Sequence, residues 1–320
     1  MRGSSGRNSS MRRRVNRIDA TVIVPTYNQA GSVGLCLTSL LAQTVPAGSY
    51  EILVVDDGST DGTPEALGGF SAPLRVVRLP ENRGRSAARN AGIREARAEQ
   101  IVFVDSDVVV RPDFLAWHLR THRDRGPGIL SRGPVVFVDT LDDVVGRSVP
   151  RFASSPAYLD TANAGLERSA VISAGMFDEA FPGYGWEDFE LGFRLRGNGI
   201  RRVFCRQAPA FHLRPSLTPG ALGALFAKEE ARARSAVYLY GKHPTLETRL
   251  LIQATVLHRV LYWIMAGAGA LHRGNLPGVV SRLQAAGLGG LAQLASRSVL
   301  NRHYLASLEH ELASHAPGMA

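Results

Sequence analysis

The sequence predicts an α/β protein built on a mostly parallel central sheet. Short apolar runs of strand length alternate with segments in which apolar residues recur at helical spacing. Strands that alternate with helices form parallel sheets with right-handed crossovers, and the helices cover both faces. At 320 residues, 45% of them hydrophobic, the chain is long enough to bury a substantial core. We therefore expect a Rossmann-like sheet flanked by helices, followed by a helical C-terminal extension.

The N-terminal third of the sequence contains the clearest strand and helix patterns. Apolar runs predict strands at 20–25, 51–55, 74–79 and 101–104. Apolar residues at helical spacing predict helices at 32–43 and 86–97. A further helix is predicted from Thr63-Pro64-Glu65, because proline is favoured in the first turn, where its missing N–H has no intrahelical partner to lose.

The pattern becomes less regular after Asp113. We expect a helix at 113–123, a strand at 134–138, an irregular stretch from about 140 to 168 and a return to the sheet at 171–177. A glycine- and aromatic-rich turn leads into a helix within 181–199, and short strands follow at 202–204 and 208–211. The remainder is helical and rich in leucine, alanine and arginine. These changes divide the chain into a basic tail (1–18), an α/β domain (19–217) and a helical region (218–320).

Charge and cysteine content narrow the class of protein. The net charge is +9, and six arginines precede the first acidic residue, so we expect residues 1–18 to be disordered. No aromatic-rich basic motif or zinc finger accompanies this charge, which argues against nucleic-acid binding. The tail lacks the apolar core of a signal peptide, and the distant Cys36 and Cys205 predict no disulfide framework. We therefore expect a cytoplasmic protein.

One apolar segment raises the question of membrane contact. Residues 250–271 are nearly long enough to span a bilayer, but Gln253, His258 and Arg259 interrupt them. This pattern favours a long buried or amphipathic helix. Because arginines flank the segment, peripheral contact with the inner face of a membrane stays open, as does a homodimer formed through leucine-rich helix faces.

Two carboxylates end the fourth predicted strand, in the sequence Ile101-Val102-Phe103-Val104-Asp105-Ser106-Asp107. Open α/β sheets bind their ligands at the carboxyl ends of the strands. Asp105 and Asp107 are two positions apart, so in extended backbone their side chains point to the same side. Two oxygen donors on one side suit a divalent cation, which in turn suits a phosphate. The alternative is an ordinary polar turn after a strand.

The first two strands also end in polar residues that suit nucleotide binding. Pro25-Thr26-Tyr27-Asn28 follows the first strand, and Asp56-Asp57-Gly58-Ser59 follows the second. In a parallel sheet both ends lie at the same edge as Asp105 and Asp107. A carboxylate there can accept hydrogen bonds from a ribose or a base, and Tyr27 can stack on a base. The alternative is that the second sequence is only a turn.

Three arginines follow the third strand, in the sequence Glu81-Asn82-Arg83-Gly84-Arg85-Ser86-Ala87-Ala88-Arg89. The parallel sheet again brings them to the same edge. Arginine recognises diphosphates through forked hydrogen bonds, and Arg85 and Arg89 are our candidates for this contact. The alternative is a solvated helix start.

A second constellation surrounds Trp186-Glu187-Asp188, at the predicted start of a helix. The helix dipole favours acidic residues at this position, so a simple cap is one explanation. A carboxylate in a half-buried aromatic setting can instead act as a general base. His212, after a short strand, is either a third metal ligand or an ordinary structural histidine.

Together these motifs resemble the inverting, nucleotide-sugar-dependent glycosyltransferases of family 2, which have the GT-A fold. The resemblance covers roughly residues 20–215 and rests on five sequences in the family's order: VIVPTYN, VVDDGSTDGT, ENRGRSAARN, VFVDSD and WEDFELGFRL. The last of these resembles the acceptor-side motif of chondroitin-polymerase-like and β-1,4-galactosyltransferase-like enzymes. Phe189 departs from the galactosyltransferase-like pattern, which leaves the acceptor open.

The resemblance implies a role for each candidate residue. The nucleotide-sugar donor, expected to be a UDP-sugar, would be held by Pro25, Thr26, Tyr27, Asn28, Asp57, Arg85, Arg89, Asp105, Ser106, Asp107 and Trp186. Mn²⁺ or Mg²⁺ would be held by Asp107, Asp105 and His212. Asp188 would be the general base for transfer to an acceptor hydroxyl, with Glu187 orienting the acceptor. The acceptor would be a glycan, a lipid-linked glycan or a small molecule.

Three other functions stay open. A sugar-phosphate nucleotidyltransferase has a similar fold, but that class usually carries a glycine-rich loop with a basic residue near the first strand, which the sequence PTYNQAGS lacks. A non-catalytic sugar-nucleotide binding module would not need the acidic residues retained here. A lipid phosphate as the acceptor would keep the chemistry, and the helical C-terminal region is compatible with it.

Overall fold

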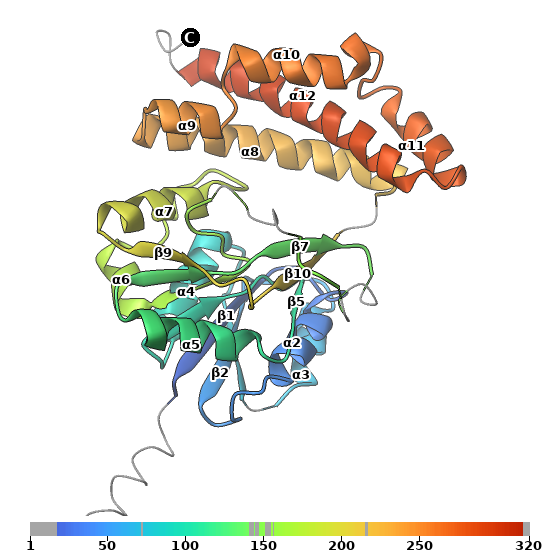
Figure 1. The fold of residues 1–320 in the computed structure, drawn as a ribbon. Helices are drawn as coiled ribbons and strands as arrows, with labels where there is room; N and C mark the ends of the chain where they lie inside the picture. Colours follow the sequence, from blue (N-terminus) through green and yellow to red (C-terminus); the bar gives the residue numbers. More distant parts are fainter. Residues whose placement is uncertain are drawn as a thin grey trace, which may run out of the picture. The chain divides into compact units, whose positions relative to one another are not determined.

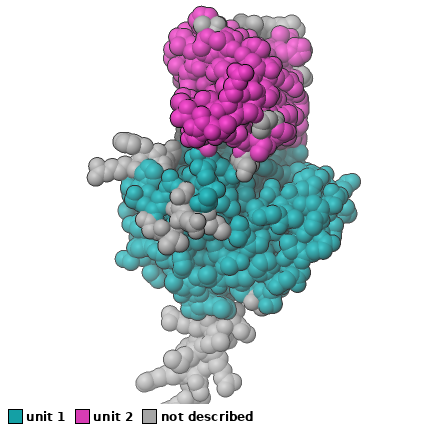
Figure 2. Space-filling view, turned by 90° about the vertical axis from the view of Figure 1, so that its right-hand side faces the viewer, with its two compact units in different colours: residues 1–179, 188–214 teal, residues 180–187, 215–320 magenta. Residues whose placement is uncertain are grey.

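The computed structural model of the chain describes residues 18–71, 73–140, 144, 147–150, 155, 157–214 and 217–315. The predicted basic tail lies outside the described residues, apart from Ile18. The chain forms two compact units, which Figure 2 shows in different colours. The first comprises Met1–Glu179 and Asp188–Arg214, and the second comprises Ala180–Glu187 and Pro215–Ala320. The second unit thus combines the C-terminal region with a short segment from within the α/β part of the sequence.

The first unit is built on a seven-stranded sheet with the order β3-β2-β1-β4-β8-β6-β9 (Figure 1). All neighbouring strands are parallel except β8, which is antiparallel to β4 and β6, so the predicted mostly parallel sheet is confirmed. The carboxyl ends of the parallel strands and the amino end of β8 therefore lie at one edge. The strands are β1 (Ala20–Thr26), β2 (Tyr50–Asp56), β3 (Leu74–Arg78), β4 (Gln100–Phe103), β6 (Ile129–Arg132), β8 (Ala164–Glu167) and β9 (Arg201–Phe204).

A smaller three-stranded sheet begins at that edge. Its order is β5-β10-β7, and β10 is antiparallel to β5 and parallel to β7. Strand β5 begins a few residues after β4 ends, so the chain passes directly from the large sheet into the small one. The three strands are β5 (Val108–Val110), β7 (Val135–Val138) and β10 (Ala210–Leu213).

Alternating side chains of the central strands form a separate apolar core on each face of the large sheet. Val102 and Val104 belong to the core that includes helices α2, α3 and α5, whereas Ile101 and Phe103 belong to the core that includes α4, α6 and α7. This alternation follows the two-residue period of a strand buried on both faces. The helices are α2 (Val33–Leu41), α3 (Thr63–Gly68), α4 (Arg85–Glu95), α5 (Phe114–Arg125), α6 (Arg168–Ser173) and α7 (Glu187–Gly197).

The expectation that residues 171–177 return to the sheet is wrong. Residues Arg168–Ser173 form helix α6, and Gly175 then adopts a φ of +87° in the turn that follows. The start of α6 is capped by a residue distant in sequence, because Glu99 Oε1 accepts a hydrogen bond from the backbone N–H of Ser169 at 3.0 Å. Sequence periodicity alone does not reveal such a partner.

Strands β5, β6 and β8 were not predicted. Strand β8 lies inside the stretch expected to be irregular, and its sequence Ala-Gly-Leu-Glu has little intrinsic strand preference. Pairing with β4 on one side and β6 on the other stabilises it. Tertiary context therefore overrides local propensity at this position.

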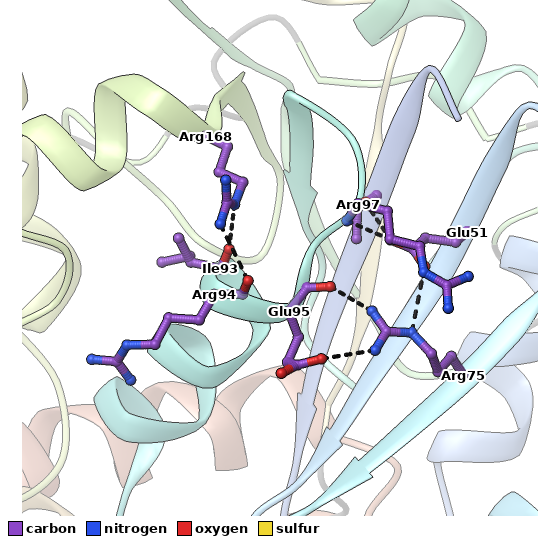
Figure 3. Close-up of polar contacts among 8 residues, drawn as sticks. Glu51, Arg75, Ile93, Arg94, Glu95, Arg97 and Arg168 are labelled. Atoms are coloured by element: carbon purple, nitrogen blue, oxygen red, sulfur yellow. Dashed lines mark hydrogen bonds and ion pairs between the residues drawn. The ribbon is translucent and has the colours of Figure 1, made fainter. Parts of the chain in front are cut away.

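Ion pairs and hydrogen bonds fasten the amino-terminal edge of the sheet, opposite the edge described above (Figure 3). Glu51, which is 4% exposed, accepts hydrogen bonds from Thr21 Oγ1 at 2.7 Å and from the backbone N–H of Arg97 at 2.8 Å. Arg75 lies 3.5 Å from Glu51 and also bonds the carboxylate of Glu95 at 3.0 Å. In Figure 3, Arg168 points toward the carbonyl groups at the end of α4. These contacts join β1, β2, β3 and α4.

A buried histidine joins α5 to the central strands. His118 is 0% exposed; its Nε2 lies 3.0 Å from Asn163 Oδ1 and its Nδ1 lies 2.8 Å from Ser131 Oγ. The Asn163 side-chain N–H groups donate to the carbonyls of Pro134 and Ala208, which leaves Oδ1 as the acceptor for an imidazole N–H. Burial lowers the pKa of His118 to about 3, so the ring is neutral in the folded protein at physiological pH.

The second unit is a set of helices with its own core. Helix α8 and helix α12 pack along each other, and α10 and α11 pack against α12 (Figure 1). Residues of α8, α11 and α12, such as Phe226, Leu276 and Val299, form a separate apolar cluster. Among the described residues, no helix has the length and apolar character needed to cross a membrane. The helices are α8 (Leu222–Lys242), α9 (Leu246–Leu251), α10 (Val256–Met265), α11 (Leu276–Ala285) and α12 (Gly289–His315), with short 3₁₀ turns at Pro219–Ala221 and Gly267–Gly269.

The neutral His118 predicts a loss of stability in mild acid. Its pKa is lowered on folding from 6.5, so below that pH the unfolded chain binds a proton that the folded chain does not. Stability should therefore be complete above pH 6.5 and fall as the pH drops, by about 2 kcal/mol at pH 5. Urea denaturation between pH 8 and pH 5 measures this. His118→Gln should flatten the profile, whereas His310→Gln, at an exposed position of α12, should retain it.

Candidate active site

Strand pairing brings three predicted metal ligands together at the carboxyl edge of the sheet. Asp105 and Asp107 lie in the turn between β4 and β5, and His212 lies on β10. The antiparallel register places His212 opposite Val108, the residue after Asp107. Possible ligand atoms of the three side chains lie within 4.8 Å of one another, and His212 Nε2 is 3.5 Å from Asp107 Oδ1. The structure thus unites residues separated by more than a hundred positions in the sequence.

Opposing effects set the charge of the two carboxylates. Burial raises the pKa of Asp105, but the guanidinium groups of Arg89 and Arg85 and the His212 ring outweigh this and hold it below its ordinary value. Arg89, only 2% exposed, forms an ion pair with Asp105 at 3.1 Å. Burial and the neighbouring Asp105 charge raise the pKa of Asp107, although His212 opposes them. The negative charge of the two neighbouring carboxylates would therefore stabilise a cation bound near Asp107.

The donor set at this cluster fits a divalent metal ion. Two carboxylates and one imidazole offer the oxygen and nitrogen ligands that Mn²⁺ accepts, and all three side chains are partly exposed. Their side-chain exposures of 23%, 33% and 20% leave a route for a ligand to reach them from solvent. Ser106, between the two carboxylates, is 6% exposed and belongs to the tight turn that holds them.

The loop after β1 and the loop after β2 are bonded to each other. Asn28, at a φ of +51°, accepts hydrogen bonds through Oδ1 from the backbone N–H groups of Thr60 and Asp61, at 2.9 and 3.3 Å. Its own backbone N–H donates to Ser59 Oγ at 2.9 Å. Beside it, Tyr27 is 39% exposed, so its ring is available for stacking. Pro25 and the buried Thr26 form the end of β1 beneath this loop.

Asp57 holds the loop that precedes α4. Its two carboxylate oxygens accept hydrogen bonds from the backbone N–H groups of Arg83 and Gly84, each at 2.8 Å. Asp57 is 3% exposed, and burial raises its pKa, against the effect of those two hydrogen bonds. Arg85, the first residue of α4, is exposed and close enough to Asp105 and Asp107 to lower the pKa of both. The arginine loop therefore lies at the same edge as the carboxylate pair.

The residues around the start of α7 divide between the two units. Glu187 and Asp188 are the first two residues of the helix, as predicted. Asp188 belongs to the first unit, where its charge acts on Arg132. Trp186 and Glu187 belong to the second unit, where the Trp186 indole N–H donates to the backbone carbonyl of Arg232 at 3.0 Å. Trp186 is 5% exposed and adopts a φ of +75°.

Two charged residues of the first unit were not predicted from the sequence. Arg132, at the carboxyl end of β6, is 2% exposed; its guanidinium donates to the backbone carbonyls of Ala157 and Ser155. Asp160 precedes β8, and burial raises its pKa. The Arg132 charge opposes this rise, and the Asp105 charge adds to it. The charges of Asp160 and Asp188 in turn act on the Arg132 guanidinium. The sequence gives little sign of these two residues, because Arg132 ends strand β6, which was not predicted. The charge interactions that connect Asp105 to Asp188 through Asp160 and Arg132 are therefore seen only in the folded structure.

Acidic residues cluster at the carboxyl ends of the strands of this α/β domain, and the sequence around them is similar to that of a known family. Residues 21–167 match the sequence model of the family described as glycosyl transferase family 2. The match covers somewhat less than half of the chain, and within it the sequence is similar to glycosyltransferase family 2 domains. Strands β2 to β4, the Asp105–Asp107 pair and β8 lie inside this match, as does β1 apart from Ala20.

Sequence relatives of the chain include named bacterial glycosyltransferases. An uncharacterized glycosyltransferase, YfnE of Bacillus subtilis, is 26% identical over 60% of this chain and 64% of its own length. The validoxylamine A glucosyltransferase of Streptomyces hygroscopicus subsp. jinggangensis is 29% identical over 59% of this chain and 54% of its own. The chain thus matches between about half and two thirds of these relatives' length.

Solved glycosyltransferase structures share the fold and confirm the predicted GT-A class. The mannosyltransferase PcManGT of Pyrobaculum calidifontis, in complex with GDP-Man and Mn²⁺, has a TM-score of 0.61 at 22% identity, over 94% of this chain and 88% of its own. S. aureus TarS 1–349, in complex with UDP-GlcNAc, has a TM-score of 0.52 at 19% identity, over 93% of both chains.

The backbone of Glu81 lies so close to Gly58 that adding one methyl group there should reduce the stability of the protein. Gly58 has a φ of +72°, and a Cβ there would lie 2.5 Å from the backbone carbon of Glu81. Gly58→Ala should destabilise the protein by about 1–3 kcal/mol through backbone strain and steric overlap. Urea denaturation measures the change. Gly48→Ala is the matched control, since its added methyl group would have no atom within 4 Å; an equal loss in both variants would contradict the prediction.

Proposed function

We propose that this chain is a metal-dependent, inverting glycosyltransferase that moves a sugar from a UDP-sugar to an acceptor hydroxyl. The observation that carries the proposal is the cluster of Asp105, Asp107 and His212 at the carboxyl edge of a family 2 domain. Nucleotide-sugars bound to structural neighbours, GDP-Man with Mn²⁺ in one and UDP-GlcNAc in another, support the class of donor. A nucleotidyltransferase is disfavoured by the family match.

In this proposal Asp107 and His212 are ligands of Mn²⁺ or Mg²⁺, and Asp105 faces the sugar or ribose of the donor. The bound ion would neutralise negative charge on the departing diphosphate. Arg85, exposed at the start of α4, would contact the same diphosphate. Arg89, expected from the sequence to do so too, is buried against Asp105, so we assign it the positioning of that carboxylate.

The loops after β1 and β2 would bind the nucleoside. Tyr27 has the exposure needed to stack on a base, and Asn28 holds its loop in place through the Thr60 and Asp61 amides. Both oxygens of Asp57 already accept a backbone hydrogen bond, but each retains a further acceptor site for a base N–H or a ribose hydroxyl. Pro25 and Thr26 would line the floor of this subsite.

Asp188 would be the general base of a single displacement. It would accept the proton of the acceptor hydroxyl as that oxygen bonds to the anomeric carbon, while the bond from the anomeric carbon to the diphosphate breaks. Attack opposite the leaving group inverts the anomeric configuration. The Arg132 guanidinium, held by two backbone carbonyls, lies close enough to Asp188 for the two charges to interact.

The acceptor side of the proposal rests on the start of α7. Glu187 would orient the acceptor beside Asp188. Trp186, expected from the sequence to contact the donor, is only 5% exposed and bonds the backbone of Arg232, so we assign it the positioning of this segment. The likeness of WEDFELGFRL to chondroitin-polymerase-like enzymes stays a prediction, as does the choice among a glycan, a lipid-linked glycan and a small-molecule acceptor. Within α7, Glu190 is fully buried and bonds Arg194 at 3.0 Å, so this pair supports the helix.

Donor use tests the proposal directly. Turnover or donor hydrolysis should be greatest with a UDP-sugar among UDP-, GDP- and dTDP-sugars, and should be lost when Mn²⁺ and Mg²⁺ are removed by a chelator. Asp107→Asn should weaken Mn²⁺ binding, measured by calorimetry, because it removes an anionic ligand. The control Asp113→Asn, after β5, should bind Mn²⁺ normally. Turnover that persists without metal would remove the roles given to Asp107 and His212.

Replacing the proposed base should affect chemistry more than donor binding. Asp188→Asn should lower kcat by about 10²–10⁴-fold and leave the donor KM within a few fold, because an amide cannot accept the proton. Asp124→Asn, on the exposed end of α5, is the matched control and should keep full activity. An Asp188→Asn enzyme with most of its activity would exclude the general-base role.

A further inference from the structure

Helix α10 carries its apolar side chains on the face away from the rest of its unit. The exposed side chains, 41–73% accessible, are Val256, Leu257, Val260, Leu261, Trp263, Ile264 and Met265. His258, Tyr262 and Ala266, spaced one turn apart, are less exposed, and the helix packs against α12. Helices of globular domains normally bury their apolar stripe, so α10 is oriented the opposite way. An unusually large apolar surface faces outward as a result.

Other helices of the second unit also expose apolar side chains. Leu246 and Leu250 on α9 are 72% and 51% exposed, and Leu291 and Leu294 at the start of α12 are each 51% exposed. A groove of about 390 Å³ between α10 and α12 is lined by apolar residues such as Val260 and Trp263, and by the charged residues Arg259, Arg302 and Glu309. Exposed apolar patches of this kind mark interaction sites.

The charge of the same region indicates which partner covers it. Arginines outnumber carboxylates in this region, since residues 248–311 contain Glu309 and Glu311, of which Glu309 pairs with Arg259 at 2.7 Å, and six arginines: Arg249, Arg259, Arg273, Arg282, Arg297 and Arg302. Arg282, Arg297 and Arg302 are exposed. Apolar side chains, a tryptophan and surrounding arginines form the combination that binds the boundary between anionic headgroups and acyl chains.

A second copy of the chain fits this surface less well. Homodimers commonly place the same patch of each subunit face to face. Such pairing here would bring the arginine-rich surfaces of two copies together, and Glu309 already pairs with Arg259 within each copy. The phosphates of an anionic lipid surface supply the charge that compensates the arginines.

We propose that α10 is an interfacial helix that docks this protein onto an anionic lipid bilayer. The ten residues of α10 extend only about 15 Å, too short to span the hydrocarbon core, so the helix lies along the surface. Leu257, Ile264 and Trp263 insert at the headgroup boundary, and the neighbouring arginines contact lipid phosphates. This inference goes beyond the proposed function and does not depend on it.

Vesicle binding by the full chain tests the proposal. The protein should co-sediment with phosphatidylcholine–phosphatidylglycerol vesicles, bind pure phosphatidylcholine vesicles far more weakly, and dissociate in high salt. The fluorescence of Trp263 should shift to shorter wavelength on binding, and Trp263→Phe should abolish the shift. Leu257→Gln/Ile264→Gln should lower the partition coefficient at least about tenfold, because both side chains are exposed and lose apolar contact with lipid.

Two controls separate α10 from other contributions. The arginine-rich residues 1–17 also attract anionic vesicles, so the test variant changes no charge. Leu35→Gln/Ile172→Gln makes the same kind of change at exposed apolar positions of the first unit, and should bind vesicles normally. Unchanged binding by Leu257→Gln/Ile264→Gln overturns the proposal. A dimer in analytical ultracentrifugation that this variant dissociates, without any loss of vesicle binding, assigns the surface to a second copy instead.

Discussion

The ion pair between Arg89 and Asp105 is the contact on which the candidate site depends. It joins α4, which follows β3, to the turn after β4, and so links two successive βα segments at the edge of the sheet. Arg89 is almost fully buried, so loss of Asp105 would remove a carboxylate partner from a buried charge. The pair also keeps Asp105 ionised despite burial, and this charge raises the pKa of Asp107. One buried guanidinium therefore influences both carboxylates of the cluster.

Structural contacts lie at one edge of the central sheet, and the candidate active-site residues lie at the opposite edge. At the amino-terminal edge, Glu51 and Arg75 join three strands and α4 through short polar contacts. At the carboxyl edge, loops carry partly exposed charged groups, and the small sheet adds His212 from a distant part of the chain. Parallel pairing is the cause, because it places every loop that follows a parallel strand on the same side. The helical second unit has its own core and an outward apolar face.

Much of this arrangement follows from local sequence patterns. Alternating apolar runs identify β1 to β4 and their helices, and strand-end motifs identify Asp57, Asp105 and Asp107 without any knowledge of the fold. Local patterns do not predict an element whose structure depends on contacts with residues distant in the sequence. Helix α6 is capped by Glu99, and β8 is held between two strands, so neither shows a decisive signal in its own residues. Arg132 was missed for the same reason, because strand β6 was not recognised.

The sequence by itself determined the fold class, the family resemblance and the acidic strand end, because these depend on residues adjacent in the chain. Only the tertiary structure decided which of these residues meet. It placed His212 beside Asp107 through the pairing of β10 with β5, and buried Arg89 against Asp105. It also turned the apolar side of α10 outward, which helical periodicity alone predicts to be buried. Periodicity reports that a face is apolar, whereas the packing of neighbouring helices decides what that face contacts.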